Sequence, residues 1–381
     1  MAVSTPTAMA PTQSKAKAPT ARVWGDKGVS EKFIVQDQQM IETPTFNQLT
    51  LADAGLLSEL MHHHYGAYTI ATATRDVFGP YTYLNLYQFF AGSNTPLISL
   101  GGEMLGILQI IEYPFTSNEV PSDTLSVENP LTNSSDYFNY PSATGPMRVW
   151  TRVPVALRLA GVRGGYVGYI TLQNKRIANT IKPSFNLFGA SSPFSATAAS
   201  GFGQAAYVGG TVTAAPIFET WKVLNTVPRL RSQMPLFGFT RYIQQVQQPY
   251  SGTSFTYDFE PGGELMRAVF QFVDATAAGG MATANLASIV FQYGTNKQMD
   301  VYTPYRNIQE QIHTYGRALP QGCMIFDYYT RHRTLVDTKS TENTANVQVV
   351  AQFSPGYSVP ANSVVNVMLD KVFVVQNYLG K

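Results

Sequence analysis

From about Lys32 onward, the sequence repeats one pattern: short segments rich in aromatic and β-branched residues, separated by glycine, proline and polar turn residues. Segments of this kind predict β-strands, and their regular spacing favours a sandwich or a barrel. Only 13% of the residues are charged, whereas tyrosine and phenylalanine number 22 each. Aromatic rings pack well on pleated sheets, so we expect an all-β protein.

One clear helix is expected within the second series of strands, at residues 304–315. Thr303 can cap its N-terminus, and Gly316 can end it as a left-handed residue. Three apolar residues recur at helical spacing and predict one buried face: Ile308, Ile312 and Tyr315. A second segment, "LADAGLLSELMHHH" (51–64), fits either a helix or a buried strand.

The length of 381 residues allows two domains. The segment "TVPRLRSQMP" (226–235) has prolines near both ends and little periodicity, so it is predicted to be a linker. The predicted units are an N-terminal arm (1–32), a first domain (33–225) and a second domain (236–381). Two long inserts, Tyr113–Pro146 and Ala190–Gly210, are predicted to be surface loops.

A possible internal duplication appears in "LYQFF" and "VFQFV". Gln88 lies in the first segment and Gln271 in the second. Each is followed 21 positions later by another glutamine, Gln109 in "LGILQIIEY" and Gln292 in "LASIVFQYG". If these four segments are strands, the two halves would share one topology. The alternative is chance, because short strand segments resemble one another.

The N-terminal arm is rich in Ala, Thr, Pro and Ser, and such a composition buries too little apolar surface to fold on its own. Its basic residues are Lys15, Lys17, Arg22, Lys27 and Lys32. The arm is either a solvated tail or a segment that touches a membrane. No apolar run reaches the roughly 18 residues of a membrane span, and the start lacks the apolar core of a secretory signal.

Few residues suggest chemistry, and we predict no catalytic, cofactor-binding or metal-binding residues. His62 and His64 would share one face of a strand and could bind zinc, but no partner is evident, so a surface or interface run (His62–His64) is preferred. The only cysteine, Cys323, is expected to be a buried core thiol. A basic cluster at Arg331–Arg333 is interpreted as a solvated or inter-subunit salt-bridge site. Asp258 and Glu260 would share one face of a strand and are interpreted as charges that keep an edge strand soluble.

Several segments occur in an order that resembles a known family. They are "QQMIETPTF", "VFGPYTYLNLYQFF", "TRVPVALRL", "GGYVGYITLQNKR" and "IKPSFNL" in the first half, and "FQFVDATAAGG", "YRNIQEQIHTYGRALPQG" and "CMIFDYYT" in the second. Together they span about Gln38 to Leu379. The chain resembles the double jelly-roll major capsid proteins of tectivirus-like, membrane-containing icosahedral viruses, the lineage that includes adenovirus hexon.

This resemblance implies two tandem eight-stranded jelly rolls and a structural function. Its members form homotrimers with a pseudo-hexagonal outline, which tile the shell of a virion such as a bacteriophage over an internal membrane. The implied partners are other copies of the chain, penton and minor capsid proteins, and the viral membrane through the arm. The net charge of +2 predicts no sequence-specific binding of nucleic acid. The protein would be made in the host cytoplasm.

Two other classes of protein fit the composition less well. A carbohydrate-binding or adhesin-like β-sandwich could stack sugars on exposed rings of the first insert: Tyr137, Phe138 and Tyr140. A jelly-roll enzyme of the cupin type would need a set of histidines and carboxylates around a metal. We therefore predict a protein that is not an enzyme and has no cofactor.

Overall fold

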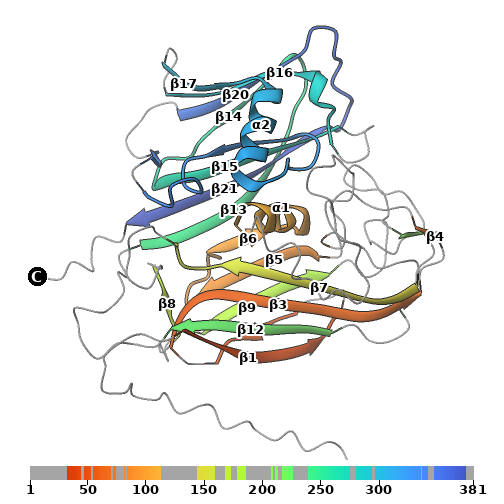
Figure 1. Cartoon of the computed structure of the whole chain (residues 1–381), viewed down its shortest axis with the longest axis vertical. Helices are drawn as coiled ribbons and strands as arrows, with labels where there is room; N and C mark the ends of the chain where they lie inside the picture. The colour runs from red at the N-terminus through yellow and green to blue at the C-terminus, as the bar shows by residue number, and fades with distance from the viewer. Residues whose placement is uncertain are drawn as a thin grey trace, which may run out of the picture.

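The structure is a computed structural model of the whole chain (Figure 1). The residues that it describes are 32–43, 47–52, 55–69, 72–73, 81, 84–112, 144–158, 168–172, 178–185, 207–208, 211–212, 217–225, 239–274, 280–293, 297–335, 337–341 and 347–374.

The first half of the chain forms strands β1–β12 and one helix. The strands are β1 (Lys32–Ile41), β2 (Leu49–Thr50), β3 (Leu56–Thr69), β4 (Thr72–Ala73), β5 (Leu84–Ala91), β6 (Ile98–Leu100), β7 (Thr144–Pro154), β8 (Ile170–Thr171), β9 (Asn179–Phe185), β10 (Tyr207–Val208), β11 (Thr211–Val212) and β12 (Ile217–Asn225). Helix α1 (Gly102–Glu112) lies between β6 and β7 in the sequence.

The second half forms strands β13–β21, a second helix and one 3-10 turn, Thr283–Asn285. The strands are β13 (Phe239–Pro249), β14 (Ser254–Asp258), β15 (Glu264–Val273), β16 (Leu286–Tyr293), β17 (Lys297–Tyr302), β18 (Cys323–Asp327), β19 (Lys339–Ser340), β20 (Val347–Phe353) and β21 (Val364–Val374). Helix α2 (Pro304–Tyr315) lies between β17 and β18.

Both halves have the same strand order. In the first half, one sheet runs β1-β12-β3-β7 and the other runs β2-β9-β5-β6. In the second half, the corresponding sheets run β13-β21-β15-β18 and β14-β20-β16-β17. In each half the first strand pairs with the last, and the helix joins the same two strands. This is the double jelly-roll arrangement, so the predicted all-β fold class is confirmed.

The two jelly rolls are joined through a continuous sheet. Strand β6 of the first half pairs in parallel with β13 of the second, and the resulting sheet has nine strands. Figure 1 shows the first half below, the second half above and α1 between them. One hydrophobic cluster spans the junction and includes residues of both halves, such as Leu108 and Met368. A second cluster fills the second jelly roll, around Phe270 and Phe291.

The predicted equivalence of Gln88 and Gln271 is wrong. Gln88 lies in β5, which corresponds by sheet order to β16 of the second half, whereas Gln271 lies in β15, which corresponds to β3 of the first. Gln109 lies in α1, and Gln292 lies in strand β16. The two halves do repeat one topology, but at a different alignment from the one that the glutamines suggested.

Three secondary-structure expectations are decided by the structure. The ambiguous segment 51–64 is mainly strand, because β3 begins at Leu56. The prediction that "LGILQIIEY" is a strand is wrong, since most of this segment belongs to α1. Helix α2 is confirmed, with the Thr303 side chain accepting from the backbone N–H of Arg306 and Gly316 at a φ of 78°. Neither described helix is long and apolar enough to cross a membrane.

The predicted inserts and domain limits lie mostly outside the described residues. Strand β7 begins at Thr144, inside the expected insert Tyr113–Pro146, and β10 lies inside Ala190–Gly210. The expected linker, 226–235, is not described, so the limits of the domains remain a prediction.

Candidate functional site: the junction of the two jelly rolls

Helix α1 is the centre of the junction. Its residues are almost all buried, including Met104, Leu108 and Ile111, because the helix packs against both halves. The N-terminus of α1 approaches the preceding chain closely: a Cβ at Gly102 would lie 1.9 Å from the carbonyl oxygen of Tyr81. Only glycine fits such a close backbone approach.

Backbone bonds continue this junction beside the helix. The N–H of Ile243 in β13 donates to the carbonyl of Leu97 at 2.8 Å, next to the β6 pairing of Ile98. The N–H of Gly101, just before α1, donates to Oε1 of Gln245 at 2.7 Å. The second jelly roll therefore fixes both the strand and the helix start of the first.

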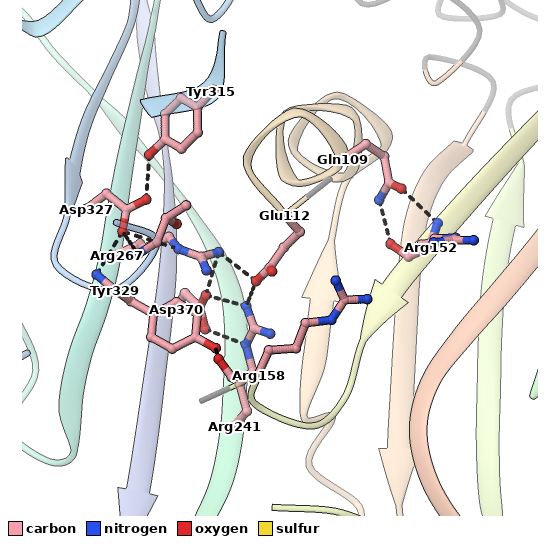
Figure 2. Close-up of polar contacts among 11 residues, drawn as sticks. Gln109, Glu112, Arg152, Arg158, Arg241, Arg267, Tyr315, Asp327, Tyr329 and Asp370 are labelled. Atoms are coloured by element: carbon pink, nitrogen blue, oxygen red, sulfur yellow. Dashed lines mark hydrogen bonds and ion pairs between the residues drawn. The ribbon is translucent and has the colours of Figure 1, made fainter. Parts of the chain in front are cut away.

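A buried ionic cluster lies at the C-terminal end of α1 (Figure 2). Arg241 Nη2 lies 2.5 Å from Glu112 Oε1 and 2.6 Å from Asp370 Oδ2, and its Nε donates to Asp370 Oδ1 at 2.8 Å. These side chains come from β13, α1 and β21. The cluster therefore links the helix of the first half to two strands of the second.

Arg267 in β15 completes the cluster. Its Nη1 lies 2.8 Å from Glu112 Oε1 and 3.2 Å from Asp370 Oδ2, and its Nε lies 3.6 Å from Asp327 Oδ1. Its guanidinium also lies 5.0 Å from the centre of the Tyr329 ring. Arg267 is fully buried, so its charge depends on these carboxylates rather than on water.

The charges of the cluster hold Glu112 ionised. Burial alone raises the pKa of Glu112, but the guanidinium groups of Arg267 and Arg241 outweigh burial and hold its pKa well below the ordinary value. A carboxyl group with a lowered pKa stabilises the fold above its unfolded pKa, near 4.3, and loses this contribution as the pH falls toward the folded value. The junction is thus built to persist at neutral and mildly acidic pH.

Two tyrosines extend the cluster toward neighbouring segments. Tyr315, the last residue of α2, donates its hydroxyl to Asp327 Oδ2 at 2.5 Å. Tyr329 donates its hydroxyl to the carbonyl of Arg158 at 2.5 Å. The segment after β7 in the first half is therefore tied to the segment after β18 in the second (Figure 2).

Each jelly roll also uses an amide to cover the outer edge of the strand that follows its helix. Gln109 in α1 donates to the carbonyl of Arg152 at 2.6 Å and accepts from its N–H at 2.8 Å. In the second half, Asn307 in α2 donates to the carbonyl of Ile325 at 2.7 Å and accepts from its N–H at 3.0 Å. These side chains satisfy strand groups that have no neighbouring strand in the described chain.

The expected apolar face of α2 is partly wrong for this reason. Asn307, Gln311 and Tyr315 are the buried stripe, while Ile312 is 46% exposed. Gln311 donates to the carbonyl of Cys323 at 3.0 Å and accepts from the N–H of Leu319 at 2.8 Å. A pair of amides at i and i+4 was the signal in the sequence that could have identified this face.

The histidine run is not a surface feature as a whole. His62 and His64 share the inner face of β3, as a strand requires, and both are buried, which corrects the expectation of a surface or interface run. His62 contacts the Tyr87 hydroxyl at 2.8 Å and the Thr220 hydroxyl at 3.3 Å, and His64 pairs with Glu42. Burial lowers the pKa of His62 to about 3, so its ring is neutral at pH 7.

The other predicted residues are placed as follows. Cys323 is buried, as expected, and burial raises the pKa of its thiol. Asp258, Glu260, Arg331 and His332 are exposed. Lys15, Lys17, Arg22 and Lys27 lie outside the described residues, as do Tyr137, Phe138 and Tyr140, and Lys32 is described only as the first residue of β1. Among the described residues, no group of three or more His, Cys, Asp or Glu could hold a metal.

Comparison with solved structures finds the same fold in viral capsid proteins. The STIV MCP aligns with a TM-score of 0.63 at 13% identity, covering 91% of this chain and 98% of that chain. The PBCV-1 virus capsid gives a TM-score of 0.60 at 8% identity, covering 92% and 95%. The major capsid protein P2 from Bacteriophage PM2 gives 0.54 at 9% identity, covering 91% and 99%.

These alignments extend over nearly the whole of each chain, so the shared fold is the complete double jelly roll. No protein-family model matches the chain, and no curated protein matches its sequence.

Proposed function

We propose that the protein is a structural major capsid protein, which builds the shell of an icosahedral virion by self-association. One observation carries this proposal: the likeness to viral capsid proteins covers both jelly rolls and the junction between them, rather than a single domain. The junction supports it physically, because continuous sheet, buried helix and ionic cluster make the two jelly rolls one rigid building block. A carbohydrate-binding module is not favoured, since the neighbours in fold are shell proteins.

The working unit of this proposal is a homotrimer. Three copies contribute six jelly rolls of one topology, which suits a near-hexagonal block in a shell. Light scattering of the purified full-length chain is expected to give a mass three times that of the 41.8 kDa subunit. A strictly monomeric chain at high concentration would count against the proposal.

The N-terminal arm is proposed to contact the internal membrane of the virion. The basic residues of the arm suit anionic lipid headgroups, and each contributes about 1 kcal/mol of binding free energy near such a surface. Deleting residues 1–31, which leaves β1 complete, is expected to preserve trimers and the unfolding transition. Sedimentation with vesicles containing phosphatidylserine should show weaker binding than for the full-length chain, and equal binding by both chains would exclude this role.

The remaining parts of the proposal follow from the shell position. Penton and minor capsid proteins would be neighbours in the virion, the chain would be made in the host cytoplasm, and a bacteriophage is one such source. We expect no catalytic activity and no sequence-specific contact with nucleic acid.

A further inference from the structure

Residues of the two jelly rolls can be equated from their strand registers. In β3, Ser58 is an extra residue opposite β12, and in β15, Met266 is an extra residue opposite β21. The residue that follows each bulge is Glu59 in the first half and Arg267 in the second. Ladder positions counted from these bulges therefore correspond between the halves.

The first strands of the two halves align at the same ladder positions. In the first half, Val223 pairs with Glu59 on one side and with Ile34 of β1 on the other. In the second half, Asp370 pairs with Arg267 on one side and with Ile243 of β13 on the other. Ile34 and Ile243 therefore correspond. Gln36 and Gln245 then correspond as well. A side-chain contact supports this correspondence. His63 contacts Glu219 in the first half, and at the same ladder position of the second half Gln271 accepts from Asn366.

The helix ends of the two halves align in the same way. Strands β5 and β16 have equivalent bulges, and the pairs that follow place Leu100 of β6 at the position of Tyr302 of β17. Ser99 then corresponds to Val301. The helices begin at Gly102 and at Pro304, two residues after Leu100 and Tyr302.

Inside the chain, these positions make the junction. Ile243 is fully buried, Gln245 accepts from the N–H of Gly101, and Gln244 lies opposite Ser99 in the parallel pairing of β13 with β6. On α1, the second residue, Glu103, accepts from Gln271 at 2.8 Å, and the ninth, Ile110, is buried.

Their counterparts at the other ends of the molecule are exposed. Ile34 is 51% exposed and Gln36 is exposed, although Ile243 and Gln245 are interior contacts. Val301 of β17 is 46% exposed, and on α2 the second residue, Tyr305, is 64% exposed and the ninth is Ile312. Strands β1 and β17 are also the outermost strands of their sheets in the part of the chain that the structure describes.

We propose that the β17 edge and the outer face of α2 dock on the β1 edge of a second copy of this chain. The contact would repeat the internal junction: β17 pairs in parallel with β1, Val301 lies opposite Val35, and Gln36 accepts from the backbone N–H of Thr303. The occupant is a second copy because each surface matches the one that its counterpart already contacts within the chain. This inference rests on the proposed self-association and names the surfaces that carry it.

The symmetry of such a contact follows from its two different surfaces. Each copy presents α2 and β17 to one neighbour and β1 to another, so the contact is head-to-tail. Such a contact forms a closed ring when the rotation between neighbouring copies divides a full turn. Alternating internal and copy–copy junctions then give a ring of jelly rolls with similar contacts throughout. Three copies close it in the homotrimer proposed above.

The two kinds of junction differ in their charges. At the copy–copy junction, Glu59 and Val223 stand at the ladder positions of Arg267 and Asp370, so the buried cluster is not reproduced. Exposed apolar residues such as Tyr305 remain there instead. The subunit can therefore fold with its internal junction complete before it meets a neighbour.

A disulfide between two copies tests this contact. Neighbouring strands lie about 4.8 Å apart, which is within the Cα separation of about 4.4–6.8 Å that a disulfide spans. In the full-length chain carrying Val35→Cys and Val301→Cys, oxidation is expected to give covalent species of two and three chains on a non-reducing denaturing gel. The native Cys323 is buried and does not compete.

A matched control carries Val35→Cys with Val246→Cys, which uses another exposed strand residue, and is expected to stay single-chain. A second variant, Tyr305→Glu, should lose trimers by light scattering while its subunit keeps the far-ultraviolet circular dichroism of the unmodified chain, whereas Val246→Glu should keep them. Trimers that form without the Val35–Val301 crosslink, and that survive Tyr305→Glu, would overturn this contact but leave the capsid proposal standing. Absence of any trimer in the unmodified chain would overturn both.

Discussion

Replacing Arg267 by methionine is expected to lower the free energy of unfolding by about 3–5 kcal/mol, as is typical when one member of a buried ion pair is removed. Arg267 is fully buried, and its loss leaves Glu112 and Asp370 with the guanidinium of Arg241 alone, while Asp327 loses the guanidinium whose Nε lies 3.6 Å away. Methionine fills similar volume but compensates no charge. The change should be measured by urea unfolding at pH 7.

A matched control is Arg158→Gln. Arg158 also pairs with a carboxylate, Glu59 at 3.2 Å, but its side chain is 31% exposed. Glu59 is buried, but it keeps the guanidinium of Arg152 at 3.6 Å, and the carbonyl of Arg158 that accepts from Tyr329 is retained. The loss of stability is therefore expected to be smaller than in Arg267→Met. If both variants lost stability equally, the burial of the cluster would not be what matters.

A second readout separates this cluster from general packing. In Arg267→Met, the pKa of Glu112 should rise, because one of the two guanidinium groups that lower it is gone. The variant should therefore lose less additional stability than the unmodified chain as the pH falls below about 4. Parallel pH profiles of the two proteins would contradict the role assigned to Glu112.

The sequence was sufficient for the strands and for α2, because their signals are local. Alternation marks strands such as β14, where Phe255 and Tyr257 are buried between exposed neighbours. Helix α2 carries its own cap residues on both sides, Thr303 and Gly316. Local signals of this kind survive whatever the chain packs against.

Helix α1 could not be recognised in the same way. It packs between two jelly rolls and is apolar almost all round, so it has no polar face to reveal a helical period. Short apolar runs of this kind fit a buried strand equally well. Whether this segment is a helix or a strand depends on a junction that forms only when the second half is in place.

The repeat has a trace in the sequence, but it lies elsewhere than the glutamines suggested. The equivalent stretches are "FIVQ" at 33–36 and "YIQQ" at 242–245, which lie in the first strands of the two halves. In β1 the register shifts between Gln36 and Gln38. That bulge inserts one residue, so the likeness stops after four positions, too short to separate from chance.

The ionic cluster could not be predicted from the sequence for a different reason. Glu112, Arg241 and Asp370 lie far apart in the chain and meet only through the tertiary fold. The one local signal is a charge inside an otherwise apolar strand, as at Arg267 in "ELMRAVFQFV". Such a charge must be paired if the strand is buried, but its partner cannot be read from the strand itself.

Replacing Asn307 by leucine is expected to cost about 2–4 kcal/mol, because each buried polar group left without a partner costs about 1–3 kcal/mol. The substitution removes both bonds to the backbone of Ile325 and the bond that Gln311 donates to Asn307 at 2.8 Å. The outer edge of β18 would then be unsatisfied beside an apolar side chain. Urea unfolding measures the loss of stability.

The control is Glu310→Leu, an exposed position of the same helix away from Tyr305 and Ile312, which should change stability by no more than about 0.5 kcal/mol. Hydrogen exchange gives a local readout: the Ile325 amide should exchange faster in Asn307→Leu and at the original rate in Glu310→Leu. Equal stability of the two variants, with the Ile325 amide still protected in both, would show that the edge of β18 does not depend on this side chain. Because Gln109 holds Arg152 by the same pair of bonds, Gln109→Leu should reproduce the effect at the edge of β7.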